Sequence, residues 1–134
     1  MANLSPTAAN VKRVSGHTEQ RVAGEAVTRG APCYIKASDR KAYLGQCDST
    51  AEEAEAYWIA LNDAAADQPV TLQKGGDLDV GAVLTAGVIY VLSATAGKIA
   101  PASDLVSGNR LTVIGVPLST SRLRLAPAAG AALA

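Results

Sequence analysis

The run of residues that decides the fold class is Val88-Ile89-Tyr90-Val91-Leu92, the strongest strand-forming stretch in the chain. β-Branched and aromatic side chains favour extended backbone, and Gly87 just before the run supplies a turn. Other short runs occur along the chain, separated by polar or glycine-rich turns: Cys33-Tyr34-Ile35, Ala42-Tyr43-Leu44, Val70-Thr71-Leu72, Leu78-Asp79-Val80, Leu111-Thr112-Val113-Ile114 and Leu123-Arg124-Leu125. Many short strands at close spacing predict an all-β barrel or sandwich.

One segment has a helical pattern, so we expect an all-β domain with one short helix. Residues 49–56 read Ser-Thr-Ala-Glu-Glu-Ala-Glu-Ala, in which Ser49 and Glu52 have the spacing of a capping box. Glutamates early in a helix also suit its positive end. The pattern predicts about two to three helical turns, and residues 101–105 predict a second, weaker turn.

Two parts of the chain resemble each other at an offset of 57 residues. Gly24, Thr28 and Gly30 fall against Gly81, Thr85 and Gly87, and Ala37 and Lys41 fall against Ala94 and Lys98. Either the domain is built from two equivalent halves, or two unrelated hairpins share the common Thr-x-Gly turn.

The length of 134 residues fits one compact domain. We divide the chain into an N-terminal arm at residues 1–20, a β-barrel domain at 21–125 and an alanine-rich C-terminal tail at 126–134. The two terminal stretches lack periodicity, so they either fray or act as extended arms that become ordered on a neighbouring subunit. Phe is absent and Trp occurs once. Because small side chains bury little area, we expect modest monomer stability supplemented by assembly.

The charge balance excludes two classes of partner. Twelve basic and twelve acidic residues cancel, and no basic stripe or polybasic run suggests nucleic acid or an anionic membrane. The N-terminal residues lack the apolar region of a secretory signal, which predicts synthesis in the cytoplasm.

Residues that carry catalysis or bind metals are few and scattered. His17 is the only histidine, and Cys33 and Cys47 lack the spacing of a metal site. Asp77 and Asp79 begin a calcium-loop pattern that does not continue. We therefore predict no metal, no cofactor and no enzymatic activity. A hydrolase with a cysteine nucleophile paired to His17 is formally available, but nothing beside either cysteine would lower the pKa of its thiol.

The two cysteines have two readings. In a reducing compartment such residues are more often small buried apolar groups than a disulfide, although a bridge between Cys33 and Cys47 stays open at this point.

Five residues are the candidate contacts with a partner. Tyr57 and Trp58 follow the expected helix, where they either cap the core as its largest apolar group or anchor a subunit contact. Val11, Val14 and Leu133 are apolar residues on the polar terminal stretches, so we expect them to face a neighbour.

The middle of the chain resembles the capsid decoration, or cement, proteins of tailed bacteriophages. The resemblance covers roughly residues 20–125 and is carried by strand and turn patterns at residues 24–34, Ile59-Ala60-Leu61-Asn62-Asp63-Ala64-Ala65, residues 84–101 and Leu111-Thr112-Val113-Ile114-Gly115-Val116. The alanine-rich tail after Leu125 departs from the pattern, which leaves its role open.

The resemblance implies a fold, a function and a partner. Such proteins are compact β-barrels or β-tulips that bind the outer face of an icosahedral shell. By resemblance, the chain is a structural virion protein that binds the major capsid protein, cements adjacent capsomers, and associates with copies of itself, as a homotrimer or alternatively a homodimer. The resemblance transfers no catalytic residue. The alternative function is a head-fibre or tail-associated β-barrel binding module, or a carbohydrate-binding appendage.

Overall fold

The computed structural model describes residues 3–132, and of residues 129–132 it describes the backbone alone. Within this range the chain forms eleven strands and two 3-10 helices. The strands are β1 Lys12–Arg13, β2 His17–Val22, β3 Pro32–Ile35, β4 Ala42–Leu44, β5 Trp58–Ala60, β6 Pro69–Lys74, β7 Gly76–Asp79, β8 Tyr90–Leu92, β9 Ile99–Pro101, β10 Arg110–Pro117 and β11 Arg122–Ala132. The 3-10 helices are η1 Ala8–Asn10 and η2 Ala102–Asp104.

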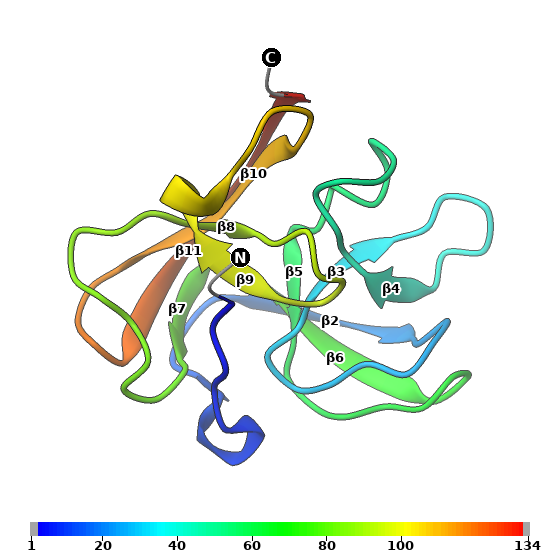
Figure 1. Ribbon diagram of the computed structural model, residues 1–134. Helices are drawn as coiled ribbons and strands as arrows, with labels where there is room; N and C mark the ends of the chain where they lie inside the picture. The colour runs from blue at the N-terminus through cyan, green and yellow to red at the C-terminus, as the bar shows by residue number, and fades with distance from the viewer. Residues whose placement is uncertain (1–2, 133–134) are drawn as a thin grey trace.

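The strands form two antiparallel sheets that lie side by side in Figure 1. Sheet A has the order β1-β7-β11-β10-β8-β9, and sheet B has the order β2-β6-β5-β3-β4. The prediction of an all-β domain is confirmed. Within residues 3–132 each sheet keeps two edge strands, so the sheets do not close into a barrel.

The two sheets repeat one topology. The order of sheet B recurs in sheet A as β7-β11-β10-β8-β9, and β1 adds a further strand at the edge of sheet A. The register recurs as well, each pair of β3 with β4 reappearing 57 positions later: Cys33↔Leu44 as Tyr90↔Pro101, Tyr34↔Tyr43 as Val91↔Ala100, and Ile35↔Ala42 as Leu92↔Ile99. We call residues 17–74 the first half and residues 76–132 the second half.

Backbone hydrogen bonds outside the strands follow the same repeat. The Lys36 N–H donates to the Lys41 carbonyl at 3.0 Å, and the equivalent Ser93 N–H donates to the Lys98 carbonyl at 3.0 Å. The Gly45 N–H donates to the Pro32 carbonyl, as the equivalent Ala102 N–H does to the Ile89 carbonyl. The Ala31 N–H donates to the Thr28 carbonyl, as the equivalent Val88 N–H does to the Thr85 carbonyl. The 57-residue echo is therefore a structural duplication, and the reading as unrelated hairpins is wrong.

The halves differ in the size of their buried side chains. The first-half core contains Ala23, Val27, Cys33, Ala42, Ala60, Ala64, Val70 and Leu72. At matching positions the second half carries larger residues: Val80 for Ala23, Leu84 for Val27, Tyr90 for Cys33 and Ile99 for Ala42. Each buried methylene contributes about 0.8 kcal/mol. At these four positions the second half therefore buries the larger apolar side chains.

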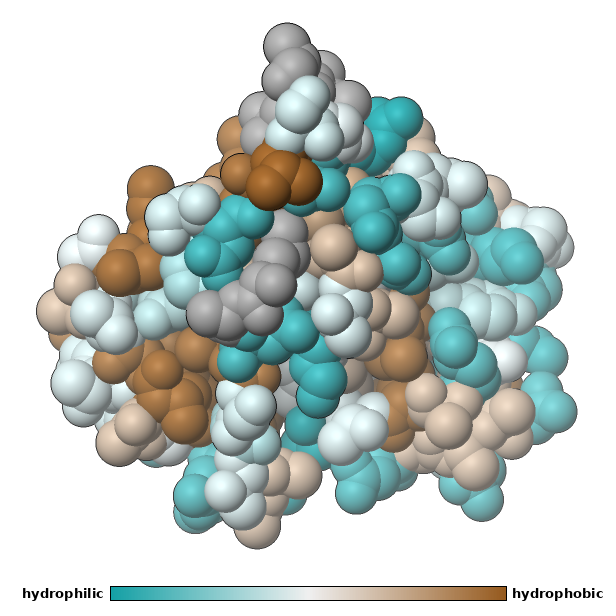
Figure 2. Space-filling view, in the orientation of Figure 1, coloured by the Kyte–Doolittle hydropathy of each residue, from teal (hydrophilic) through white to brown (hydrophobic). Residues whose placement is uncertain are grey.

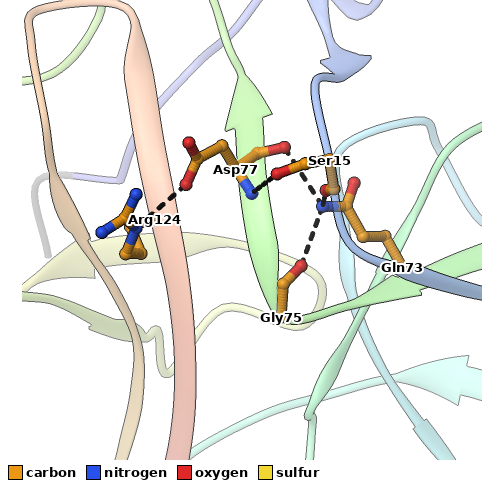
Figure 3. Close-up of polar contacts among 5 residues, drawn as sticks. All are labelled: Ser15, Gln73, Gly75, Asp77 and Arg124. Carbon is orange, nitrogen blue, oxygen red and sulfur yellow. Dashed lines mark hydrogen bonds and ion pairs between the residues drawn. The ribbon is translucent and has the colours of Figure 1, made fainter.

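A buried glutamine fixes the chain where it passes from sheet B to sheet A. Gln73 is fully buried, and its Nε2 donates to the carbonyl oxygens of Ser15 at 2.6 Å, Gly75 at 2.9 Å and Asp77 at 3.2 Å (Figure 3). The Asp77 N–H donates to the Ser15 Oγ at 3.1 Å, and the Asp77 carboxylate accepts from Arg124 Nε at 3.0 Å. One amide thus ties the N-terminal segment to both sides of the crossover.

The crossover itself requires glycine. Gly75 and Gly76 have φ angles of +72° and +73°, which side chains other than glycine rarely adopt. A Cβ atom at Gly76 would also overlap the Ser15 carbonyl oxygen and the Gly16 Cα. Glycine therefore lets the N-terminal segment approach closely enough to accept from Gln73.

A second set of contacts joins the halves directly. The Cys47 N–H donates to the Ser93 carbonyl at 3.1 Å, and the Arg110 N–H donates to the Cys47 carbonyl at 2.8 Å. Buried Thr112 donates from its Oγ1 to the Ala54 carbonyl at 2.6 Å. Because polar groups buried with partners are costly to separate, these bonds hold the halves as one body.

Residues 49–56 form a turn instead of the expected helix of two to three turns. The Ala54 N–H donates to the Thr50 carbonyl, and the capping box forms one residue later than expected, between Thr50 and Glu53 at 3.3 Å in both directions. The helix stops because the buried Ala54 carbonyl accepts from Thr112 instead of a later residue of the same segment. The weaker turn expected at residues 101–105 is confirmed as η2.

The terminal stretches, as far as the structure describes them, are part of the fold. In place of an arm at residues 1–20, β1 pairs with β7, β2 pairs with β6, and the Leu4 N–H donates to the Ile99 carbonyl at 2.8 Å. In place of a free tail at residues 126–134, β11 continues to Ala132 against β10. These residues order on their own chain because each finds strand partners there.

We expect Gln73→Glu to destabilise the protein by about 3 kcal/mol or more. A carboxylate has no hydrogen to donate, so it would bring a buried charge against three carbonyl oxygens. Urea unfolding measures the effect. The control is Gln20→Glu at an exposed position of β2, where the change should stay within about 0.5 kcal/mol. Equal stability of the two variants would contradict the role given to the amide.

Glu53 makes the stability of the 50–54 turn depend on pH. Hydrogen bonds from Ser49, and then from Thr50, hold the pKa of Glu53 below its ordinary value of 4.5. Its stabilising contribution is therefore complete above pH 4.5 and is lost as the pH falls through the lower pKa of the folded state. We expect Glu53→Ala to cost about 1 kcal/mol at neutral pH, and we expect this cost to diminish as the pH falls below 4.5, as measured by thermal unfolding. Glu55→Ala, which removes an exposed glutamate of the same turn, is the control at neutral pH and should change stability by no more than about 0.5 kcal/mol.

Candidate functional site

Three side chains form a row across one face of sheet B. His17 on β2 lies opposite Lys74 on β6. Trp58 on β5 lies one position beyond the Ile59↔Gln73 pair, which sets it beside Lys74. Directly opposite residues on neighbouring antiparallel strands point to the same face. With Tyr57, these residues form what we call the Trp58 patch.

The members of the Trp58 patch contact one another through their rings. The His17 and Trp58 ring centroids lie 6.2 Å apart at an interplanar angle of 53°. The Lys74 Nζ lies 5.5 Å from the Tyr57 ring centroid and 5.6 Å from that of Trp58. Both distances are within the range of a cation–π interaction, so the ammonium group is held between two aromatic faces.

Trp58 packs against the core, as one of the two readings of the sequence predicted, and it also keeps part of its ring accessible. It packs against the first-half core and is half-buried, as is Tyr57. Part of each ring stays accessible, and Lys74 is exposed. The patch therefore combines an anchored aromatic surface with a cation, which suits contact with an apolar surface that carries carboxylates.

The edge of the patch is charged. The His17 Nε2 lies 3.3 Å from a Glu19 carboxylate oxygen, and Arg21 lies 2.7 Å from the other. The hydrogen bond with His17, aided by Arg21, lowers the pKa of Glu19 below its usual value. Glu19 is thus ionised at neutral pH and engaged by its neighbours, which leaves Lys74 as the exposed charge among the rings.

The five candidate contact residues have different environments. Tyr57 and Trp58 lie together in the patch. Val14 is 41% exposed beside β7, where its N–H donates to the Asp77 carbonyl. Val11 is fully buried in the main core cluster, so the expectation that it faces a neighbour is wrong: its own core covers it. Leu133 lies outside the described residues.

Neither cysteine has the environment of a nucleophile. Both thiols are free and both residues are fully buried. Burial, together with nearby Glu25, raises the pKa of Cys33 to about 12, and burial and Asp48 raise the pKa of Cys47. Each cysteine is a thiol at neutral pH and packs as a small apolar group.

The acidic residues singled out in the sequence have structural partners. Asp77 binds Arg124, and an Asp79 carboxylate oxygen accepts from the Gly81 N–H at 2.9 Å. Among residues 3–132, no group of three or more His, Cys, Asp or Glu side chains could hold a metal ion. In the part of the chain that the structure describes, no helix is long and apolar enough to cross a membrane.

His17 and Lys74 are the members of the patch that sequence reasoning missed. They lie 57 residues apart, and they meet because β2 and β6 pair in one register. A comparison with protein-family models finds no matching family, and a search of curated proteins finds no match.

We expect neither thiol to react with Ellman's reagent at pH 8 in the native protein. Both are buried and protonated at that pH, and the thiolate is the reactive form. Both should react once the protein is unfolded in guanidinium chloride. The reaction is followed by absorbance. Rapid labelling of either cysteine in the native state would contradict the burial of its thiol.

Proposed function

We propose that this chain is a structural virion protein that binds the outer surface of a phage capsid and cements adjacent capsomers. The observation that carries a binding role is the Trp58 patch: two aromatic rings and a lysine on the surface of a hydrogen-bonded sheet. The resemblance of residues 20–125 to capsid decoration proteins supplies the partner, the major capsid protein.

The chemistry of the patch supports contact with another protein. Trp and Tyr contribute large contact area at little cost in side-chain entropy, and they dominate binding energy in many interfaces. Lys74 is held between the rings, so it can meet a carboxylate without first being ordered. An acidic or amide-rich surface with an apolar centre would complement this arrangement.

Assembly multiplies a weak contact. A stable interface buries roughly 1,000 Å² or more, and many copies on one shell add their contacts without each binding tightly. We propose a homotrimer on the capsid, in which each copy presents its Trp58 patch to the shell. A trimer that binds at several points resists separation of the subunits below it.

The test is co-sedimentation of the purified chain with empty capsids of the virus that encodes it. We expect stoichiometric retention, and a loss of at least about tenfold in affinity for Trp58→Ala and Lys74→Glu. Lys36→Glu is the matched control, because Lys36 also lies over an aromatic ring, Tyr43 at 5.0 Å, away from the patch.

Two outcomes would contradict the proposal at different levels. Failure of the wild-type chain to bind capsids would remove the capsid function and favour a head-fibre or tail-associated module. Full retention of Lys74→Glu and Trp58→Ala would leave the function but exclude the patch as its contact. Circular dichroism of Trp58→Ala checks that this half-buried residue was replaced without unfolding the domain.

A further inference from the structure

Exposed apolar side chains gather on the second half. Figure 2 shows hydrophobic side chains concentrated on the side where Figure 1 places the second half. Ile89 is 49% exposed, Val116 is 37% exposed and Leu118 is 49% exposed. We call these three residues the second-half face. Single exposed apolar residues are ordinary, but a group of them marks a contact surface.

The duplication shows what the same positions do in the first half. The residues 57 positions earlier are Pro32, Ile59 and Leu61. Pro32 is fully buried and Ile59 is 1% exposed, and Leu61 packs against the main core cluster. The positions exposed in the second half are thus covered in the first.

The strand register confirms that these positions are equivalent. In the first half β3 pairs with β5 through Pro32↔Ile59 and Cys33↔Trp58. In the second half β8 pairs with β10 through Tyr90↔Gly115, the counterpart of Cys33↔Trp58. Ile89 precedes Tyr90 and Val116 follows Gly115. In the first half, Pro32 and Ile59 have the same positions relative to the Cys33↔Trp58 pair.

The N-terminal segment packs beside Gly30, two residues before Pro32. Val11 belongs to the same cluster as Ile59, and a Cβ atom on Gly30 would lie 3.1 Å from a Val11 methyl group. At Gly87, the counterpart of Gly30, nothing lies within 4 Å of such an atom. Val11, which directly follows η1, fills the space at Gly30, and the equivalent space at Gly87 is open.

A second copy does not supply the cover by continuing the repeat. The second half contacts the first through residues that include Leu92, Ser93 and Arg110. Their first-half counterparts are Ile35, Lys36 and Glu53. A copy that continued the repeat would bring Lys36 where this chain has Ser93, and Glu53 where it has Arg110, so it would not reproduce the side chains of the internal junction.

We propose that the second-half face binds an uncharged segment of a partner chain that places a Val or Leu side chain over Gly87. The binding mode is that of this chain's own Leu4–Val11 segment, which is uncharged and places Val11 over Gly30. The inference goes beyond the proposed function, because it does not depend on the partner being a capsid protein.

The experiment uses the full chain, labelled with ¹⁵N, and a synthetic peptide of residues 3–11 as the probe. We expect saturable shifts of the amide signals of Gly87, Ile89 and Val116. Val116→Asp should weaken binding by about tenfold or more, as expected for loss of one buried apolar side chain. Val22→Asp, at a 42% exposed valine of the first half, is the control and should bind as the wild type does.

Three results would overturn the inference. The first is the absence of any shift at millimolar peptide. The second is a set of shifts confined to Gly30 and its neighbours, because the peptide would then only be displacing the chain's own segment. The third is self-association that Val116→Asp abolishes in sedimentation velocity, which would assign the face to a second copy. None of them depends on capsids, so failure here is distinguishable from failure of the proposed function.

Discussion

The fold depends on one side-chain amide, that of Gln73, buried where the chain leaves one sheet and enters the other. Its two hydrogens are shared among three carbonyl oxygens, which come from the N-terminal segment and from both sides of the crossover. The Oε1 of the same amide is buried without a hydrogen-bond partner. Leaving that acceptor unpaired costs about 1–3 kcal/mol, and the three donated bonds offset this cost. They also fix which way the amide points, because the opposite orientation would set oxygen against oxygen.

The duplication separates what the backbone requires from what the side chains decide. Equivalent hydrogen bonds recur in both halves whether the buried residue is Cys33 or Tyr90. The larger residue needs one extra partner, and the Tyr90 hydroxyl receives a hydrogen bond from the Thr85 N–H at 2.8 Å. One backbone arrangement thus accommodates either a cysteine or a tyrosine at the same buried position. The halves also differ in exposure at equivalent positions, because Ile59 is buried and Val116 is exposed.

Local sequence pattern predicted most of the strands and offered the repeat as one of two readings, because alternating apolar residues and Thr-x-Gly turns act over a few residues. It missed β2, which lies within the stretch assigned to an N-terminal arm. It failed where tertiary contacts decided the outcome. The capping signals at residues 49–56 form as a Thr50–Glu53 pair, but the segment is a turn whose Ala54 carbonyl accepts from Thr112 of a distant strand. Val11 was correctly identified as an apolar residue in need of cover, yet its own core supplied that cover. The pairing of His17 with Lys74 could not be predicted, since it depends on the register of strands distant in sequence.

The two exposed surfaces lie on different halves and differ in chemistry. The Trp58 patch presents aromatic rings with a cation, and the second-half face presents aliphatic side chains beside an open glycine. Because the halves are joined by buried hydrogen bonds, the two surfaces keep a fixed relation to each other. A small body with two unlike surfaces can contact two unlike neighbours at once, and the binding of one then raises the effective concentration of the other. Bridging of this kind is what the proposed role between adjacent capsomers would require.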